Sequence, residues 1–260
     1  MSGLAEPEPP ARRAAIVTGA SSGIGRAIAE AFGALGWGVA VGARREDALR
    51  ETERLVSAAG GTPFAHPLDV TDPASVEAFV TAASCALGPV DVLVNNAGIA
   101  HPGPLHELSD EDHRRILDTN LLGPLLITKR VVGALRAARR PGDVVFVSSD
   151  VVVHPRPHMG TYTVSKAGLE ALASVLAMEC EGHRIRSTVV RVGPTLSAFG
   201  AGWDPQVFAE LFPYWQRFGI QRHFEVMQPG DVARTVVAAV TAPSHMWVPL
   251  VEVQPQAPLT

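Results

Sequence analysis

The chain has 260 residues, of which 47% are hydrophobic and 18% charged, and its formal net charge is −4. This length allows a full hydrophobic core and suits one large α/β domain better than two small ones. There is no basic run suited to nucleic acid, and no apolar stretch approaches the roughly 18 residues that a membrane helix needs. The two cysteines lie far apart in the sequence, which fits a reducing cytoplasm without a disulfide framework. We therefore expect a cytoplasmic globular protein without nucleic-acid or membrane partners.

The predicted elements begin after a short N-terminal tail. Residues 1–12 are rich in Pro and Glu and lack the apolar core of a secretory signal, so we expect a flexible tail there and a single domain over 13–260. Strand-like apolar runs follow at 14–19, 38–43, 62–70, 90–95, 143–149, 186–192 and 246–253. Helical patterns lie between them at 22–35, 46–59, 73–87, 109–138, 162–181 and 230–241. This alternation predicts one doubly wound α/β domain of Rossmann type, with helices flanking a seven-stranded parallel sheet and a ligand at the carboxyl ends of the strands.

The first predicted strand ends in a glycine-rich turn, TGASSGIG at 18–25. Gly19 permits a tight turn, Gly23 lets the backbone approach a pyrophosphate, and Gly25 lets the next helix pack close to the sheet. The free N–H groups and the positive dipole end of that helix suit phosphates. The spacing is a variant of the commoner dinucleotide motif, and such glycines can also serve packing alone. The position between a strand and a helix favours a dinucleotide site, and we expect contacts from the other turn residues too: Ser21, Ser22 and Ile24.

The end of the second predicted strand indicates which dinucleotide binds. An NAD site has an acidic residue about 20 positions after the glycines, where it holds the ribose hydroxyls. This chain has Ala43, Arg44 and Arg45 there instead. A guanidinium fork matches a 2′-phosphate, so NADP(H) is favoured over NAD(H). The alternative is a solvated helix entrance, which is more plausible for Arg45 than for Arg44.

A tyrosine and a lysine stand four residues apart in YTVSK at 162–166. Residues i and i+4 of a helix lie on one face, so Lys166 would lie beside Tyr162. A free phenol has a pKa near ~10 and is a poor proton-transfer group at neutral pH. A neighbouring ammonium favours the phenolate, and we therefore expect Lys166 to lower the pKa of Tyr162. A helix that carries both residues by chance is the alternative for this pentapeptide alone.

Six elements taken in order resemble the short-chain dehydrogenase/reductase family over nearly the whole chain. They are TGASSGIG at 18–25, LDVTD at 68–72, NNAG at 95–98, Asn120, Ser149 and YTVSK at 162–166. The resemblance implies that Tyr162 is the general acid and base, and that Lys166 also binds the nicotinamide ribose. It implies that Ser149 binds the substrate oxygen, with Ser148 as the competing candidate that the pleat would turn to the other face. Asn120 would hold a water that links the lysine to solvent, and Pro124 would disturb the helix there; a purely structural asparagine is the alternative.

The resemblance also implies further cofactor contacts. Adenine would lie against Asp69 and Val70, and the inner edge of the cofactor would be lined by Asn96, Ala97 and Gly98. The segment RVGPTLS at 191–197 resembles the family's nicotinamide-binding segment, from which we expect contacts by Gly193, Thr195 and Ser197. The sequence departs from the family pattern at Val192, where proline is usual, at Ser197, where threonine is usual, and at Val152, where glycine is frequent. No metal is implied, and the histidines show no ligand spacing.

Eight of the fifteen aromatic residues fall within 199–224, where the family places a substrate lid. They are Phe199, Trp203, Phe208, Phe212, Tyr214, Trp215, Phe218 and Phe224. An aromatic lid suits a bulky apolar carbonyl or alcohol, whereas a core or a subunit interface is the alternative. His154 and His158 stand between Ser149 and Tyr162 and could face the substrate, although loop histidines are more often solvated.

These features together predict an NADP(H)-dependent oxidoreductase that moves a hydride between nicotinamide and a carbonyl or secondary alcohol. The resemblance implies a homodimer or homotetramer, with the helices near 109–138 and 162–181 as interfaces. One rival is a catalytically silent sensor that binds NADP(H), although it would not need Asn120, Ser149, Tyr162 and Lys166 together. A second rival is a sugar-nucleotide epimerase or dehydratase, whose chains are longer and carry another glycine motif.

Overall fold

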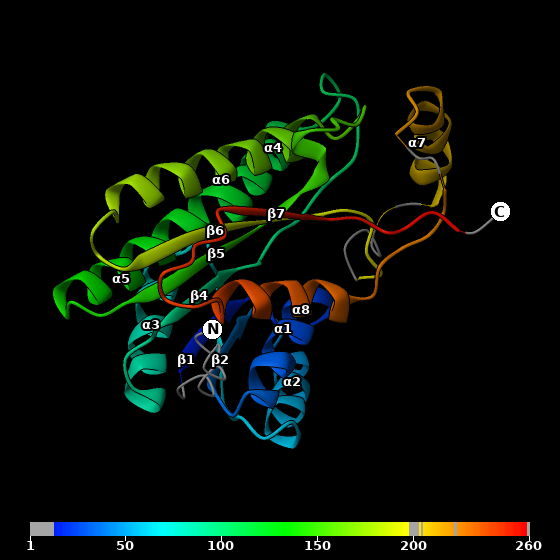
Figure 1. Ribbon diagram of the computed structural model, residues 1–260. Helices are drawn as coiled ribbons and strands as arrows, with labels where there is room; N and C mark the ends of the chain where they lie inside the picture. Colours follow the sequence, from blue (N-terminus) through cyan, green and yellow to red (C-terminus); the bar gives the residue numbers. More distant parts are fainter. Residues whose placement is uncertain (1–12, 198–202, 204, 221–222, 259–260) are drawn as a thin grey trace, which may run out of the picture.

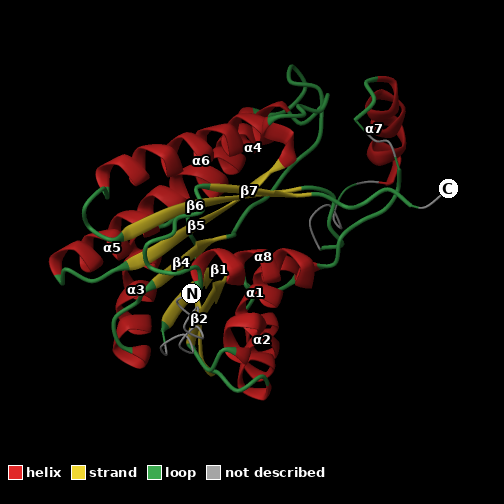
Figure 2. Cartoon of the chain, viewed as in Figure 1, coloured by secondary structure: helices red, strands yellow, loops and turns green. Residues whose placement is uncertain are grey.

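The computed structural model describes residues 13–197, 203, 205–220 and 223–258. The predicted tail at 1–12 lies outside the described residues. Figure 1 shows a central sheet with helices on both faces, and Figure 2 shows the strands running in one direction through the middle layer. No described helix is long and apolar enough to cross a membrane.

The seven strands form one parallel sheet, as the sequence predicts. In chain order they are β1 Ala14–Thr18, β2 Gly38–Ala43, β3 Thr62–Pro67, β4 Val92–Asn95, β5 Gly142–Ser149, β6 Ile185–Val192 and β7 Leu250–Val253. Strands β1, β2, β4 and β5 are buried along their whole length, which explains their continuous apolar runs. The strand order is β3-β2-β1-β4-β5-β6-β7. Strands β2 and β3 are added on one side of β1 and strands β4 to β7 on the other, so the strand order switches between β1 and β4. A ligand crevice is expected at the carboxyl ends of the strands beside such a switch point.

Two helical layers cover the sheet, and each layer encloses one apolar core. Helices α1 Gly23–Ala34, α2 Glu46–Ala58 and α8 Pro229–Val240 cover one face, and α3 Pro73–Leu87, α5 Gly123–Ala137 and α6 Gly160–Glu179 cover the other. The short helix α4 Asp110–Leu117 lies beside α6. Helix α7 Pro205–Arg217 is set apart from both layers, beyond the carboxyl ends of the strands (Figure 1).

The structure corrects one predicted helix. The segment 109–138 is not continuous but consists of α4, a π-helical turn at Asp118–Leu122, and α5. Gly123 donates its N–H to the carbonyl of Asp118, five residues back. Pro124 has no N–H to give to Asn120, so the helix widens at the disturbance that the sequence predicts. The strands predicted at 62–70 and 246–253 are also shorter, ending at Pro67 and beginning at Leu250.

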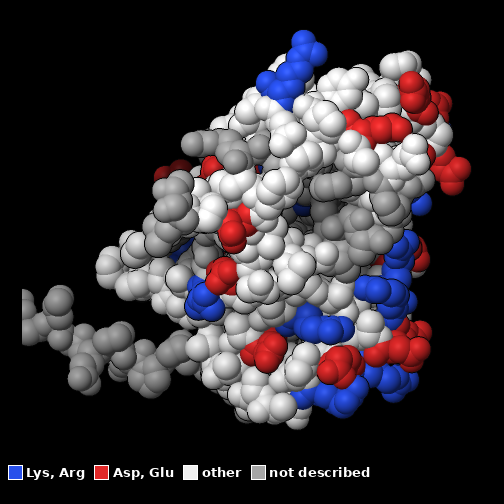
Figure 3. All heavy atoms as spheres, turned by 90° about the vertical axis from the view of Figure 1, so that its right-hand side faces the viewer, with Lys and Arg blue, Asp and Glu red and all other residues white. Residues whose placement is uncertain are grey.

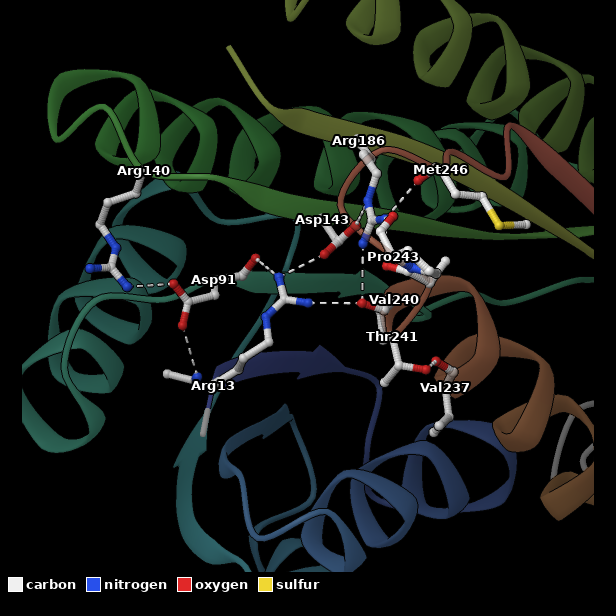
Figure 4. A network of polar contacts seen from close by, with 12 residues as sticks. Arg13, Asp91, Arg140, Asp143, Arg186, Val237, Val240, Thr241, Pro243 and Met246 are labelled. Atoms are coloured by element: carbon white, nitrogen blue, oxygen red, sulfur yellow. Dashed lines mark hydrogen bonds and ion pairs between the residues drawn. The ribbon is translucent and has the colours of Figure 1, made fainter. Parts of the chain in front are cut away.

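A network of buried charges ties the strands together at their amino ends (Figure 4). Arg13 donates to a carboxylate oxygen of Asp143 at 2.6 Å, and Arg186 donates to the other oxygen at 2.6 Å. Arg13 also donates to the main-chain oxygens of Asp91 at 3.1 Å and Val240 at 3.0 Å. The network therefore joins the starts of β1, β5 and β6 to the end of α8, at the end of the sheet away from the glycine turn.

Candidate active site

A cavity of about 710 Å³ opens at the carboxyl ends of the strands. The glycine turn after β1 forms one end of it, and aromatic residues from α7 and its flanking loops form the other. Figure 3 looks at this side of the molecule, where acidic and basic side chains are interspersed and the surface is hollowed near its centre. No group of three or more His, Cys, Asp or Glu among the described residues is placed to hold a metal ion.

The glycine turn leaves the start of α1 open toward this cavity. Gly19 has φ +65°, and an added Cβ would lie 2.7 Å from the Cα of Ala97, so only glycine fits there. Ser22 precedes α1 in an extended conformation without a side-chain cap bond, and the first turn of α1 has no acidic residue. No side chain of the cap or the first turn therefore competes for the N–H groups at the start of α1. This arrangement fits the binding of a dinucleotide phosphate.

The third glycine and an asparagine hold this turn in shape. An added Cβ on Gly25 would lie 2.5 Å from the amide nitrogen of Asn96, so Gly25 serves close packing and does not line the cavity. Asn96 donates from its side chain to the carbonyls of Thr18 at 2.9 Å and Gly19 at 3.3 Å. The Thr18 hydroxyl accepts the N–H of Asn96 and that of Ala97, each at 3.0 Å. Thr18, which joins the first strand to the NNAG segment, was not among the predicted site residues.

Both arginines after β2 are exposed and line the cavity beside the turn. Arg45 donates to the hydroxyls of Ser21 and Ser22, each at 3.0 Å. Arg44 lies close enough to Asp69 for its charge to act on that carboxyl. Burial works against the ionisation of Asp69, but two hydrogen bonds from Thr71 and the charge of Arg44 keep its pKa below the usual value. The chain thus carries two cations at the position where an NAD site has an acid.

The remaining residues predicted to contact the cofactor fall around the same cavity. Its lining includes Ser21, Ser22, Gly23, Ile24, Asp69, Val70, Asn96, Ala97, Gly98, Gly193, Thr195 and Ser197. Gly98 lies close to the proton-transfer group, since an added Cβ would be in ordinary contact with the amine of Lys166 at 3.5 Å and the side-chain oxygen of Asn120 at 3.4 Å. At Gly193 an added Cβ would collide with the side chain of Gln254, at 2.1 Å.

Tyr162 and Lys166 lie on one face of α6 and both line the cavity. The amine of Lys166 is 5.8 Å from the centre of the Tyr162 ring and donates to the carbonyl of Val147 at 2.8 Å. Both side chains are buried, so neither group has its ordinary ionisation. Burial raises the pKa of Tyr162 to about 12, even though a hydrogen bond with Ser149 opposes the rise. Burial also lowers the pKa of Lys166 to about 8, against the charge of Glu170.

The predicted direction of the Tyr162 shift is therefore wrong for this structure. From the sequence we expected the ammonium of Lys166 to lower the pKa of the phenol, but burial raises this pKa above the ordinary value. The physical reason is that burial penalises the phenolate more than the hydrogen bond with Ser149 and the charge of Arg156 favour it, and the charge of Asp150 adds to that penalty. The phenol is consequently protonated at neutral pH.

The two serines at the end of β5 point in different directions. Ser148 donates to a carboxylate oxygen of Glu170 at 2.7 Å, whereas Ser149 is hydrogen-bonded to Tyr162. The alternation of side chains along the strand explains this separation. Of the two candidates, Ser149 is the one whose hydroxyl lies at the tyrosine.

Asn120 is fully buried in the π-helical turn and does not line the cavity. Its side chain accepts the N–H of Ile99 at 2.8 Å and donates to the carbonyl of Ile99 at 2.8 Å and the hydroxyl of Ser165 at 3.0 Å. These bonds join the turn to the segment after β4 and to α6. Because the side chain is used in this way, a role in proton supply would fall to the main-chain carbonyl, to which Pro124 cannot donate.

The aromatic segment forms part of the cavity wall, as a lid would. Its lining members are Trp203, Phe212, Trp215 and Phe224. Trp215 donates to the carbonyl of Pro157 at 3.1 Å, and Trp203 donates to that of Ala100 at 3.3 Å. Phe199 and the side chain of Phe208 lie outside the described residues. Tyr214 and Phe218 are exposed, and neither His154, His158 nor Val152 lines the cavity.

An ion pair at the aromatic end of the cavity was not predicted. Arg156 donates to both carboxylate oxygens of Asp150, at 2.9 and 2.7 Å, and both residues line the cavity. Asp150 directly follows Ser149 in the sequence, and that adjacency is the one signal that could have drawn attention to it. Arg156 gives no such signal, because a loop brings it back to the carboxylate.

Comparison with known proteins identifies the class of enzyme. The model of the short chain dehydrogenase family matches residues 13–207. Glycine betaine reductase ATRR of Emericella nidulans is 35% identical over 94% of this chain, which spans only 19% of that protein's length. The 3beta-hydroxysteroid dehydrogenase 1 of Eggerthella lenta is 37% identical over 68% of this chain and 69% of its own length.

Solved structures agree with the family match. An alcohol dehydrogenase from the archaeon Thermococcus sibiricus, complexed with 5-hydroxy-NADP, has a TM-score of 0.80 at 29% identity and covers 96% of this chain and 100% of its own. A short chain dehydrogenase from Mycobacterium paratuberculosis, bound to NAD, has a TM-score of 0.85 at 27% identity and covers 93% of this chain and 96% of its own. The chain belongs to the short-chain dehydrogenase/reductase family. It is an oxidoreductase that acts on alcohol or carbonyl groups of small molecules with NAD(P).

Proposed function

We propose that this enzyme uses NADP(H) to interconvert a bulky, apolar carbonyl compound and the corresponding secondary alcohol. The observation that carries the cofactor preference is the pair Arg44 and Arg45 beside the glycine turn, at the place where an NAD site has an acid. Two guanidinium groups suit a 2′-phosphate, and an acid would repel it. The solved relatives include one with an NADP derivative and one with NAD, so the arginines carry the preference.

The proposed chemistry assigns a task to each residue of the proton-transfer group. The bound dinucleotide supplies or accepts the hydride. Tyr162, which is protonated at neutral pH, donates its phenolic hydrogen to the carbonyl oxygen in reduction and takes the alcohol hydrogen in oxidation. Ser149 donates a hydrogen bond to the same oxygen, and Lys166 holds the ribose and keeps a positive charge beside the phenol. Asn120 fixes the segment that carries this group.

The substrate class follows from the wall of the cavity. Two tryptophans and two phenylalanines line its outer end, and such a wall favours a large apolar group next to the reacting carbon. The relative from Eggerthella lenta is named a 3beta-hydroxysteroid dehydrogenase, and a 3beta-hydroxysteroid is a secondary alcohol with a large apolar group of that kind.

The assembly and location that we propose are those of the sequence analysis. A homodimer or homotetramer through α4, α5 and α6 is supported by exposed apolar side chains: Leu122, Leu125, Val164, Val175 and Met178. A cytoplasmic location is supported by the two free cysteines, Cys85 and Cys180.

The test is a screen of carbonyl compounds of graded size and polarity with NADPH and with NADH. Turnover is measured as the loss of absorbance of the reduced cofactor. We expect turnover with NADPH and a preference for large apolar ketones over small polar ones. Faster turnover with NADH would contradict the cofactor proposal. Tight NADPH binding without turnover of any member would favour the sensor instead.

A further inference from the structure

The Asp150–Arg156 pair is a buried ion pair on the wall of the site. The side chains are 7% and 9% exposed, and the guanidinium lies 5.8 Å from the centre of the Trp215 ring. Removing two charges from water costs about as much as their attraction returns, so such a pair is weak evidence for stability. Its place beside Ser149 suggests a task in the chemistry.

The task concerns the single hydrogen of the Ser149 hydroxyl. A serine hydroxyl has one hydrogen to donate and lone pairs with which to accept. Ser149 accepts the N–H of Val151 at 3.4 Å, and its hydroxyl donates a long hydrogen bond to a carboxylate oxygen of Asp150 at 3.3 Å. Tyr162 is its other partner. A free carboxylate is the stronger acceptor and would draw the hydrogen away from the reacting oxygens.

Arg156 weakens this competition because it uses both carboxylate oxygens. One nitrogen donates to the oxygen that faces Ser149, at 2.9 Å, and the other donates to the far oxygen at 2.7 Å. Gln254 adds a longer contact to the far oxygen at 3.4 Å. The contact from Ser149, at 3.3 Å, is longer than either bond from Arg156.

We propose that Arg156 holds Asp150 in a two-pronged bond so that the hydrogen of Ser149 stays available to Tyr162 and to the substrate oxygen. Asp150 and Arg156 are then positioning residues, and the inference rests on the proposed roles of Ser149 and Tyr162. The two charges also oppose each other at the phenol: Asp150 favours its protonated form, and Arg156 favours its ionised form.

The other groups around Tyr162 must be considered before its ionisation is used as a readout. Lys166 lies on its own helix, and His113 of α4 contacts the hydroxyl of the neighbouring Thr161. The described side chains of α7 that pack in its cluster are apolar. On β7, Glu252 is linked to Asp150 through Gln254, and the charge of Asp150 also acts on the carboxyl of Glu252. These groups are the same residues in every variant of the pair.

The chain allows this ionisation to be measured without substrate or cofactor. It contains two tyrosines, so Tyr214→Phe leaves Tyr162 as the single phenol. In that background, alkaline titration followed by the ultraviolet absorbance of the phenolate reports on Tyr162, while circular dichroism shows where the protein unfolds. Asp150→Asn leaves Arg156 uncompensated and should lower the pKa by about 1 unit. Arg156→Met leaves Asp150 uncompensated and should raise it by about as much, and the double variant should return toward the parent.

A matched control comes from the opposite end of the sheet. The side chains of Arg186 and Asp143 are 16% and 6% exposed, and they form an ion pair that is remote from Tyr162. Arg186→Met should destabilise the protein and leave the titration of Tyr162 unchanged. The proposal is overturned if the two single variants shift the pKa in the same direction. It is also overturned if the pKa of Tyr162 in Asp150→Asn does not fall below the pKa in the parent at any pH at which the variant is still folded.

Kinetics provide the second readout, with the best ketone of the carbonyl screen. Arg156→Met should lower kcat by roughly 10-fold with a smaller change in KM, and the added Asp150→Asn change should restore part of it. Losses that simply add in the double variant would indicate packing alone and overturn the proposal. Because the titration needs no substrate, a wrong substrate class or cofactor would leave that test intact.

Discussion

Buried aspartates paired with partly buried arginines occur at both ends of the sheet, and they are used differently. At the amino end, Arg186 donates to Asp143 and also to the main-chain oxygens of Val240, Ala242, Pro243 and Met246 (Figure 4). At the carboxyl end, the side-chain hydrogen bonds found for Arg156 among the described residues go to Asp150 alone, and both side chains line the cavity. The first network fixes strand ends and loops in place. The second pair leaves its surroundings open to a substrate.

The comparison therefore predicts that the two ends respond separately to substitution. Substitution of Tyr162 at the carboxyl end should alter catalysis with little effect on unfolding. Changes at the amino end should alter unfolding with little effect on catalysis by the folded protein.

The largest expected effect is that of Tyr162→Phe. Loss of the phenolic hydrogen should lower kcat by about 10²–10⁴-fold, since that is what a positioned general acid contributes. The free energy of unfolding in urea should change by no more than about 1 kcal/mol, because the ring stays in place and the hydrogen bond with Ser149 is lost. NADPH binding, followed by cofactor fluorescence, should persist. Unchanged turnover would mean that another group donates the proton.

Asp143→Ala tests the amino end. It strips a shared buried carboxylate from Arg13 and Arg186, which are themselves partly buried, and should lower the free energy of unfolding by about 3–5 kcal/mol. The matched control is Asp110→Ala, which removes an exposed pair with Arg114 and should cost less than about 1 kcal/mol. If kcat of the folded protein fell as far as in Tyr162→Phe, the two ends would not be independent.

Arg44→Asp tests the cofactor preference within the carboxyl end. Replacing a cation by an anion at the 2′-phosphate should raise KM for NADPH by about 10- to 100-fold, as expected for a lost charge-assisted hydrogen bond, and leave KM for NADH nearly unchanged. Arg50→Asp makes the same charge change at an exposed position of α2 outside the cavity lining. It should leave the ratio of KM for NADPH to KM for NADH unchanged. Equal ratios in the two variants would place the phosphate elsewhere.

The smallest effect is a pH dependence of stability. Between pH 8 and 10.5 the unfolded chain keeps a proton on Lys166 that the folded protein has lost, so stability should rise with pH by roughly 1–2 kcal/mol. Tyr162 acts in the opposite sense, because its folded pKa of about 12 exceeds the ordinary 10.0, and stability should fall as the pH passes from 10 toward 12. Urea unfolding across this range should show the rise in wild type and a flatter profile in Lys166→Met. A rise of equal size in that variant would assign it to other groups.

Much of this protein could be read from its sequence, because the relevant signals are local. Seven apolar runs predicted seven strands, and the spacing of Tyr162 and Lys166 predicted that both lie on one face of a helix. Pro124 predicted the disturbed helix at Asn120 for a covalent reason, since proline has no N–H to donate. The glycine turn and the missing acid after β2 were likewise visible as short patterns.

The tertiary structure decided whatever depends on burial or on contacts across loops. The sign of the Tyr162 pKa shift was one such property, because it depends on how much water the folded chain excludes from the phenol. The contact of Thr18 with the NNAG segment and the bond of Arg156 to Asp150 were others, since each joins residues that no local pattern relates. Local spacing thus determined which chemical groups the site contains, and the packing of the sheet, α6 and the following loops determined their charge states and partners.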